Sequence, residues 1–218
     1  MQNVIGRFQD PHVAWPLSLP VGQATADIGT RQLLRQVALA LFVEQGFHRV
    51  SLRQLAAALR LQAGSLYNHI ESKQALLFEL IEEHESDLLE LLATLTSRRG
   101  NGPQLLEACV RLHLQFNCQH EQRHTLARLE LRSLSDEQKH SVAQLRKTQT
   151  QHLESILARC ALPSRECSPM ALALQALLDG VVTGYPEGVR PPLNKLAELF
   201  SRMLLSGPGP EQAAARPR

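Results

Sequence analysis

Aromatic residues are scarce in this chain: they make up 4% of its 218 residues, and only one is Trp. A core with so few rings must be built mainly from Leu and Ala, which favour helices, whereas the Val, Ile and aromatic residues that favour strands are sparse. The composition therefore predicts an all-α fold. With 44% hydrophobic and 20% charged residues the chain can form a globular core, which excludes wholesale disorder.

Long hydrophobic runs are also lacking. The longest uninterrupted apolar stretch, from Val37 to Val43, falls far short of the roughly 20 residues that cross a bilayer, and the N-terminus lacks the apolar block of a secretory signal. No CxxC spacing occurs among the four cysteines, which are Cys109, Cys118, Cys160 and Cys167. These absences predict a cytoplasmic protein with reduced thiols and no membrane partner.

Charge is nearly balanced overall, at +2, but it is unevenly distributed. Residues 29–75 carry six Lys and Arg against two Glu, whereas residues 76–97 carry six acidic residues and no basic one. A basic segment followed by an acidic one is typical of a module that meets a polyanion at one end. Two ordinary solvated helix faces give the same pattern, so charge alone does not decide between these interpretations.

Helix breakers and apolar periodicity divide the chain into an arm, a head of short helices and a longer helical domain. The arm, residues 1–28, contains three prolines and has no sustained helical period, so we expect it to be irregular. From a predicted N-cap at Thr30, apolar residues recur at steps of three and four up to Gly46, which predicts one helix. Ser51 opens a short second helix, and a third begins near Gln62 with a length that fits a DNA major groove.

A longer helix is predicted to follow Ser72 and to continue to about residue 97. Further helices are expected over residues 103–119, 122–134, 136–160, 170–183 and 192–205. The prediction is an all-α chain of about nine helices. Residues 29–80 form a helix-turn-helix head, residues 81–206 a second helical domain, and residues 207–218 a flexible tail.

The third predicted helix carries residues that suit direct contact with DNA bases. Ala63, Gly64 and Ser65 are small enough to let the backbone approach base edges, and the amide of Asn68 can exchange hydrogen bonds with adenine. In a helix-turn-helix the last helix lies in the major groove. The sequence therefore predicts DNA as the partner.

Polar residues around the end of this helix are placed to contact phosphates. Tyr67, His69 and Lys73 have polar groups of suitable reach, and the helix N-terminus at Ser72 offers main-chain donors. The alternative for Tyr67 and His69 is packing between the short helices.

Four sequence blocks at fixed spacing carry a resemblance to a known family: Gly46-Phe47, Ser51 to Ala56, Gly64 to Ile70 and Ser72 to Leu76. Together they make residues 30–80, about a quarter of the chain, similar to the TetR family of transcriptional regulators. A helix-turn-helix alone is weak evidence, but this joint pattern is specific.

The resemblance implies a role for each matching position. It implies that one set of side chains holds phosphates: Ser51, Tyr67, His69 and Lys73. It implies that a second set faces the bases: Arg53, Gln62, Ala63, Ser65 and Asn68. For Arg53 the alternative is a solvated helix face. Two positions depart from the family pattern, because Arg60 replaces the turn Gly and must accept or adjust an unfavourable backbone angle, and Gln62 replaces the usual Ser cap.

The same resemblance implies that residues 81–206 bind a ligand and dimerise, with the last two helices pairing between two copies. The sequence supports this pairing, because residues 170–182 are apolar on more than one face and the final helix is similarly apolar. A homodimer places two heads on a near-palindromic operator. We therefore expect a ligand-responsive repressor that is not an enzyme and needs no cofactor.

Residues 126–153 are similar to the branch of the family that senses acyl-CoA thioesters, so the expected effector is a small apolar molecule such as an acyl-CoA. Arg128, Arg132 or Arg146 could meet the CoA phosphates. The alternative is that these arginines form ion pairs with nearby acids: Glu107, Glu130 or Glu154. The residues of the ligand pocket stay unassigned.

Two other classes of function compete with this interpretation. A metal-binding enzyme could use the cysteines and histidines of one stretch, which are Cys109, His113, Cys118, His120 and His124. Against it, the chain has no nucleophile elbow, phosphate loop or zinc-protease motif, and no metal site is expected. A DNA-bound adaptor without a small ligand would use the same fold. A filled core favours the adaptor, and an apolar pocket favours the sensor.

Overall fold

The computed structural model describes residues 23–185, 189 and 191–205. In this part of the chain there are eight α-helices, three short 3-10 helices and no strand, which confirms the all-α prediction. One of the 3-10 helices takes the third position of the head, so the expected nine helices are accounted for. The predicted tail and residues 1–22 of the predicted arm lie outside the described residues.

The head consists of four elements before the first long helix. They are α1 (Gln23–Gln45), η1 (Phe47–Arg49), α2 (Leu52–Ala58) and η2 (Ala63–Asn68). The Ser51 side chain accepts from the backbone N–H of Gln54 in a full capping box, so α2 begins where the sequence predicted. The next helix, α3 (Lys73–Thr96), is capped by Ser72, whose side chain accepts from the backbone N–H of Ala75.

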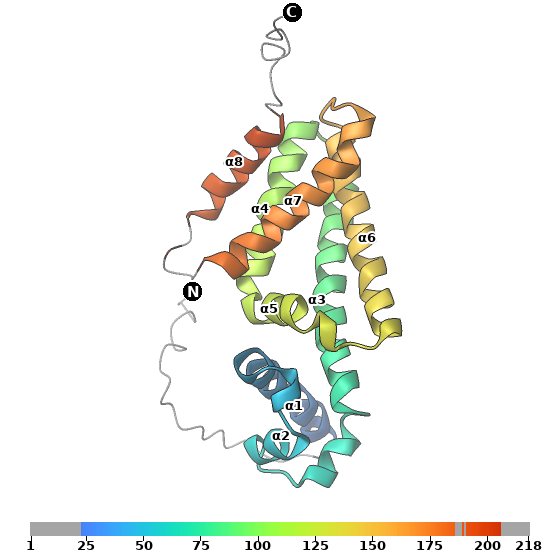
Figure 1. Ribbon diagram of the computed structural model, residues 1–218, viewed down its shortest axis with the longest axis vertical. Coiled ribbons are helices and arrows are strands. Elements are labelled where there is room, and N and C mark those ends of the chain that lie inside the picture. The colour runs from blue at the N-terminus through green and yellow to red at the C-terminus, as the bar shows by residue number, and fades with distance from the viewer. Residues whose placement is uncertain (1–22, 186–188, 190, 206–218) are drawn as a thin grey trace, which may run out of the picture.

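The C-terminal half is a bundle of five further α-helices. They are α4 (Gly102–Gln119), α5 (Glu121–Leu129), α6 (Asp136–Ala158), α7 (Ser164–Gly184) and α8 (Leu193–Leu205), with η3 (Leu131–Ser133) between α5 and α6. Figure 1 shows α3 running from the head far into this bundle, and α5 lying across it just above α1. These two helices therefore connect the head to the C-terminal half.

Two hydrophobic cores lie along the length of α3. The lower core surrounds Phe42 and Leu66 of the head and Leu76 of α3, and it also takes in Leu126 of α5 and Val142 of α6. The upper core joins the far end of α3 to α4, α6, α7 and α8. Because the lower core includes residues of both halves, a shift of α5 or α6 displaces side chains on which the head packs.

Several helix boundaries differ from the prediction. α1 begins at Gln23, so Thr30 lies inside the helix and is not its cap, and the last six residues of the predicted arm are helical. The 122–134 segment is divided, because α5 ends at Leu129 and η3 follows. α7 begins at Ser164 and contains Pro169, which was expected in a loop; Pro169 is the sixth helical residue, so the helix lacks the one hydrogen bond that its missing N–H would donate.

A close approach of two helix ends makes one glycine essential. A Cβ built on Gly102, at the start of α4, would lie 2.1 Å from the backbone oxygen of Arg159. We expect Gly102→Ala to lower the free energy of unfolding by about 1–3 kcal/mol, because backbone must move to admit the methyl group. Urea denaturation tests this. Gly29→Ala is the control, since Gly29 has open space around its Cβ position and should gain up to about 1 kcal/mol.

Candidate nucleic-acid interface and effector groove

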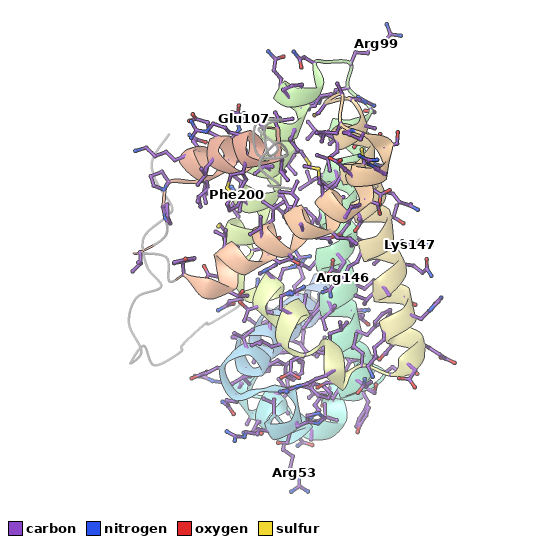
Figure 2. All side chains as sticks on the ribbon, turned by 45° about the horizontal axis from the view of Figure 1, so that its top comes forward. Arg53, Arg99, Glu107, Arg146, Lys147 and Phe200 are labelled. Atoms are coloured by element: carbon purple, nitrogen blue, oxygen red, sulfur yellow. The ribbon has the colours of Figure 1, made fainter. Side chains whose placement is uncertain are left out.

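The free end of the head presents most of the residues predicted to contact DNA. Tyr67 is 62% exposed, and five others are exposed as well: Ser51, Arg53, Gln62, Gly64 and Asn68. Ala63 and Ser65 of η2 and His69, which follows η2, are half-buried. Figure 2 shows Arg53 at the extreme end of the molecule, pointing away from it. The arrangement brings the predicted set together on one exposed surface.

The recognition element is a 3-10 helix, whereas the sequence predicted an α-helix. Leu66 of this helix is fully buried, and the next two residues, Tyr67 and Asn68, are exposed. The turn before it depends on Arg60, whose φ is +58°. This is the strained angle predicted for a non-glycine residue at this position, at a cost of about 1 kcal/mol.

The basic residues of the head are not all available to a polyanion. Arg31 and Arg35 of α1 form ion pairs with Glu79, and Arg35 also pairs with Glu83, both acids being on α3. These ion pairs neutralise, within the protein, part of the positive charge of residues 29–75 and part of the negative charge of residues 76–97. Arg49, Arg53 and Arg60 are exposed, and Figure 2 shows Arg53 at the end of the molecule.

Lys73 has a structural role that the sequence did not predict. Its Nζ donates to the backbone oxygens of Phe47 and Val50 at 2.9 and 2.7 Å, and it lies 4.2 Å from the centre of the Phe47 ring. Burial lowers the Lys73 pKa, while the Glu130 carboxylate raises it. An ammonium group has three donors, so one is left for a phosphate. The phosphate contact of Lys73 stays a prediction.

A second set of hydrogen bonds ties the head to the junction of α5 and α6. The backbone N–H of Phe47 donates to Glu130 at 3.0 Å, and the Ser133 hydroxyl donates to the same carboxylate at 2.6 Å. Ser133 Oγ also lies 3.2 Å from the ring Nε2 of His48. We call this contact the head latch. It is buried, with Glu130 only 5% exposed, so the head cannot turn relative to α5 without breaking it.

A groove of about 600 Å³ is lined by residues of α6 and α7 and by Arg128 of α5. Its apolar lining includes Ala143, Leu172 and Ala176, and its cations are Arg128, Arg146 and Lys147. Figure 2 shows Arg146 directed between the helices and Lys147 directed outward. The sequence identified two of these cations as candidate effector contacts but missed Lys147. Arg132, the third candidate, does not line the groove.

The groove arginines form ion pairs, but not with the acids that the sequence suggested. Arg128 pairs with Asp179 at 3.0 Å, and Arg146 donates twice to Glu85, at 2.8 and 2.6 Å. Glu85 belongs to α3 and is 5% exposed, so this is a buried ion pair between α3 and α6.

A chain of side-chain hydrogen bonds also joins the groove to α3. Thr150 donates to Gln175, Gln175 donates to Gln149, and Gln149 donates to the side chain and backbone oxygen of Glu85. A molecule bound in the groove therefore has direct routes to the helix that carries the head.

The cysteines and histidines of α4 and α5 do not assemble a metal site. Within the described ranges no group of three or more His, Cys, Asp or Glu side chains is placed to hold a metal ion. Cys109 is fully buried, and burial raises the pKa of its thiol to about 12, so it stays protonated and unreactive. The geometry thus provides no support for the metalloenzyme alternative.

His84 makes the stability of the fold depend on pH. Burial lowers its pKa to about 3, and the neighbouring His124 and Arg123 act in the same direction. Unfolded His84 takes up a proton below pH 6.5, whereas folded His84 does so only near pH 3. As the pH falls from 6.5 towards 3, we expect His84 alone to lower the free energy of unfolding by about 1.4 kcal/mol for each pH unit. Urea denaturation at a series of pH values should show a shallower slope for His84→Gln, and equal slopes would contradict this assignment.

Comparison with known proteins places the head in a family. Residues 34–80 match the model of the bacterial regulatory proteins of the tetR family. The transcriptional repressor KstR2 of Rhodococcus jostii is 29% identical over 91 residues, which are 42% of this chain and 45% of that protein. The chain thus spans less than half the length of this curated relative.

Two solved structures share the fold over most of both chains. A TetR-family regulator from Bordetella parapertussis is 20% identical with a TM-score of 0.73, over 81% of this chain and 94% of that one. AibR, solved in complex with isovaleryl coenzyme A and operator DNA, is 18% identical with a TM-score of 0.69, over 81% of this chain and 98% of that one.

The fold and the exposed recognition element define a helix-turn-helix protein with an all-α C-terminal domain. Residues 34–80 thus match the tetR family, and the described residues share the fold of solved TetR-family regulators.

Proposed function

We propose that this protein is a dimeric, sequence-specific repressor, acting in the cytoplasm, that a small effector releases from a near-palindromic operator. The observation that carries the proposal is the exposed surface formed by Arg53, Tyr67 and Asn68 at the free end of the head. A cation, a phenol and an amide on one surface supply phosphate and base contacts together. The family match of residues 34–80 supports the same conclusion.

The dimer is supported by the exposed apolar side chains of the last two helices. Leu177 of α7 is 43% exposed, and Leu199 and Met203, one turn apart on α8, are 41% and 58% exposed. By length and composition α7 could cross a membrane, but it packs on α4 and α6 of the bundle. A second copy of the chain would cover these side chains and bring two heads to one operator.

The groove supports a sensor rather than an adaptor. A space of about 600 Å³ with apolar walls and three cations suits a molecule that combines an apolar chain with phosphates or a carboxylate. An acyl-CoA has this chemistry, and AibR was solved with isovaleryl coenzyme A. In this proposal the acyl chain lies against Leu172 and Ala176, and the CoA phosphates meet Arg128, Arg146 or Lys147.

The head latch and α3 provide the coupling between effector and DNA. An anion that attracts Arg146 competes with Glu85, and one that attracts Arg128 acts two residues from Glu130 of the latch. The effector must bind the DNA-released state more tightly than the DNA-bound state, or it shifts nothing. Glu130 and Glu85 are therefore the residues through which the proposed release would act.

Arg53→Ala tests the DNA-binding surface. The operator is first isolated by in vitro selection from random DNA, where we expect a near-palindrome whose half-sites lie about one helical turn apart. The variant should bind it roughly 5- to 150-fold more weakly, because one base contact is lost. Arg165→Ala, with an 86% exposed side chain in the C-terminal half, is the control and should bind like the wild type. Equal affinity of Arg53→Ala and wild type would contradict the assignment of Arg53.

A further inference from the structure

A cluster of polar side chains, all buried except the half-buried Asp179, lies inside the C-terminal half and takes no part in the DNA-binding surface. Its members come from four helices: His84 of α3, His113 and Asn117 of α4, His124 of α5 and Asp179 of α7. The ring centres of His84 and His124 are 5.7 Å apart, and His124 Nε2 lies 3.2 Å from the Asp179 backbone oxygen. His113 Nε2 lies 3.8 Å from the Asp179 carboxylate. We call this set the inner polar cluster.

Polar atoms of this cluster are left without partners. His84, His113 and Asn117 are 2%, 0% and 0% exposed. Among the described residues no hydrogen-bond partner exists for His84 Nδ1, His113 Nδ1 or either amide atom of Asn117, and His113 Nε2 has only the Asp179 carboxylate at 3.8 Å. More than nine tenths of buried polar groups in folded proteins are hydrogen bonded, because leaving one unpaired costs free energy. The concentration of four such atoms on two neighbouring helices therefore indicates a place for a polar group.

The inner polar cluster is connected to the groove between α6 and α7. A second space, of about 10 Å³, is lined by His84 and His124 and by four residues that also line the groove: Arg128, Arg146, Gln175 and Asp179. This volume corresponds to about one water-sized group, so it accommodates a single oxygen atom of a larger molecule. The two ion pairs of Arg128 and Arg146 thus stand between the groove and the cluster.

The inner polar cluster and the groove differ in charge. Burial lowers the pKa values of His84 and His124, so both rings are neutral at physiological pH. The two rings line the small space, and a neutral imidazole offers one donor and one acceptor, which suits an uncharged hydroxyl or carbonyl oxygen. The groove outside carries three cations against two carboxylates, which suits an anionic group.

We propose that the inner polar cluster is the specificity site for the effector, an apolar acid or its thioester whose chain carries a terminal hydroxyl or carbonyl oxygen. This inference rests on the effector-release function proposed above. The anionic end lies in the groove beside Arg146 and Lys147, the chain lies against Leu172, and the terminal oxygen hydrogen bonds to His84. Because His84 and Glu85 are neighbours on α3, the effector is sensed by the helix that enters the head.

The test compares matched ligands that differ only in the terminal oxygen. Full-length protein is titrated calorimetrically with straight-chain acids from hexanoic to hexadecanoic acid and with the ω-hydroxy acid of each chain length. At the chain length that spans the groove, we expect the hydroxy acid to bind at least about tenfold more tightly, because a site built to hydrogen bond a hydroxyl rejects the analogue that lacks it.

Variants of His84 assign the preference to the cluster. His84→Phe keeps a ring to stack on Phe116, 5.1 Å away, but removes the polar atoms, so the tenfold preference should disappear. His84→Gln should retain part of it, and His140→Phe, on the exposed face of α6, should leave it unchanged. Thermal melting confirms that each variant is folded.

Three outcomes would overturn the proposal: equal affinity at every chain length, no binding of either acid, or a preference that survives His84→Phe. Equal affinity would mean that water alone occupies the cluster. DNA takes no part in these titrations, so their failure leaves the DNA-binding proposal intact. Loss of specific DNA binding with a retained hydroxyl preference would instead contradict only the proposed repressor function.

Discussion

Placing charges on the exposed apolar face of α8 is expected to convert the proposed dimer to a monomer and to weaken operator binding by about 100-fold or more. Leu199 and Met203 are both exposed within one chain, so Leu199→Asp with Met203→Asp should leave the fold of the protomer intact. In a dimer the second head binds as an intramolecular step, which strengthens overall binding by about 10²–10⁴ without any new contact.

Sedimentation and DNA titration with the same preparation test this expectation. Leu91→Asp, at another exposed leucine on α3, is the matched control and should remain dimeric with unchanged affinity. A double variant that stays dimeric would contradict the assignment of this face. A monomer that binds the operator as tightly as the wild type would contradict the two-headed mode of binding.

Removing the guanidinium of Arg146 is expected to cause a large loss of stability. Arg146→Leu leaves the Glu85 carboxylate buried without its cation, and breaking a buried ion pair in this way costs about 3–5 kcal/mol. The double variant with Glu85→Leu removes the charge as well and should recover most of that loss. In urea denaturation the single variant should unfold at a clearly lower denaturant concentration than either the wild type or the double variant.

Two results would contradict this account of the pair. Arg146→Leu could unfold at the wild-type urea concentration, which would mean that Glu85 finds another partner. Alternatively, the double variant could be as unstable as the single one, and the loss would then come from packing of the Arg146 side chain rather than from its charge.

The head could be predicted closely from the sequence because its structure depends on local signals. Ser51 and Ser72 cap their helices as predicted, Gly46 adopts a positive φ, and Arg60 takes the strained angle expected of a residue in the turn. Leu66 is buried while Tyr67 is exposed, as the spacing of apolar residues indicates. The main error was the form of the recognition element, since six residues between two turns carry too little periodicity to distinguish a 3-10 helix from an α-helix.

The contacts between the two halves could not be predicted, because they depend on how long helices pack. Phe47 and Glu130 are 83 residues apart in the chain, and Arg146 and Glu85 are 61 apart. The sequence marked Arg128 and Arg146 as candidate effector contacts but suggested the wrong acids as their partners. The sequence marked the histidines of α4 and α5 only through their helical spacing with nearby cysteines. This spacing gave no indication that His84, on α3, lies beside them.

The most direct test of the central claim is the binding of the full-length protein to DNA from its own upstream intergenic region. The titration is repeated over a range of salt concentrations and in the presence of excess random DNA. We predict tight binding that survives the competitor and weakens steeply with salt, as expected when several cations replace condensed counterions on the phosphates. Binding no stronger than to random DNA, for this region and for neighbouring promoters, would contradict its role as a sequence-specific regulator of local genes.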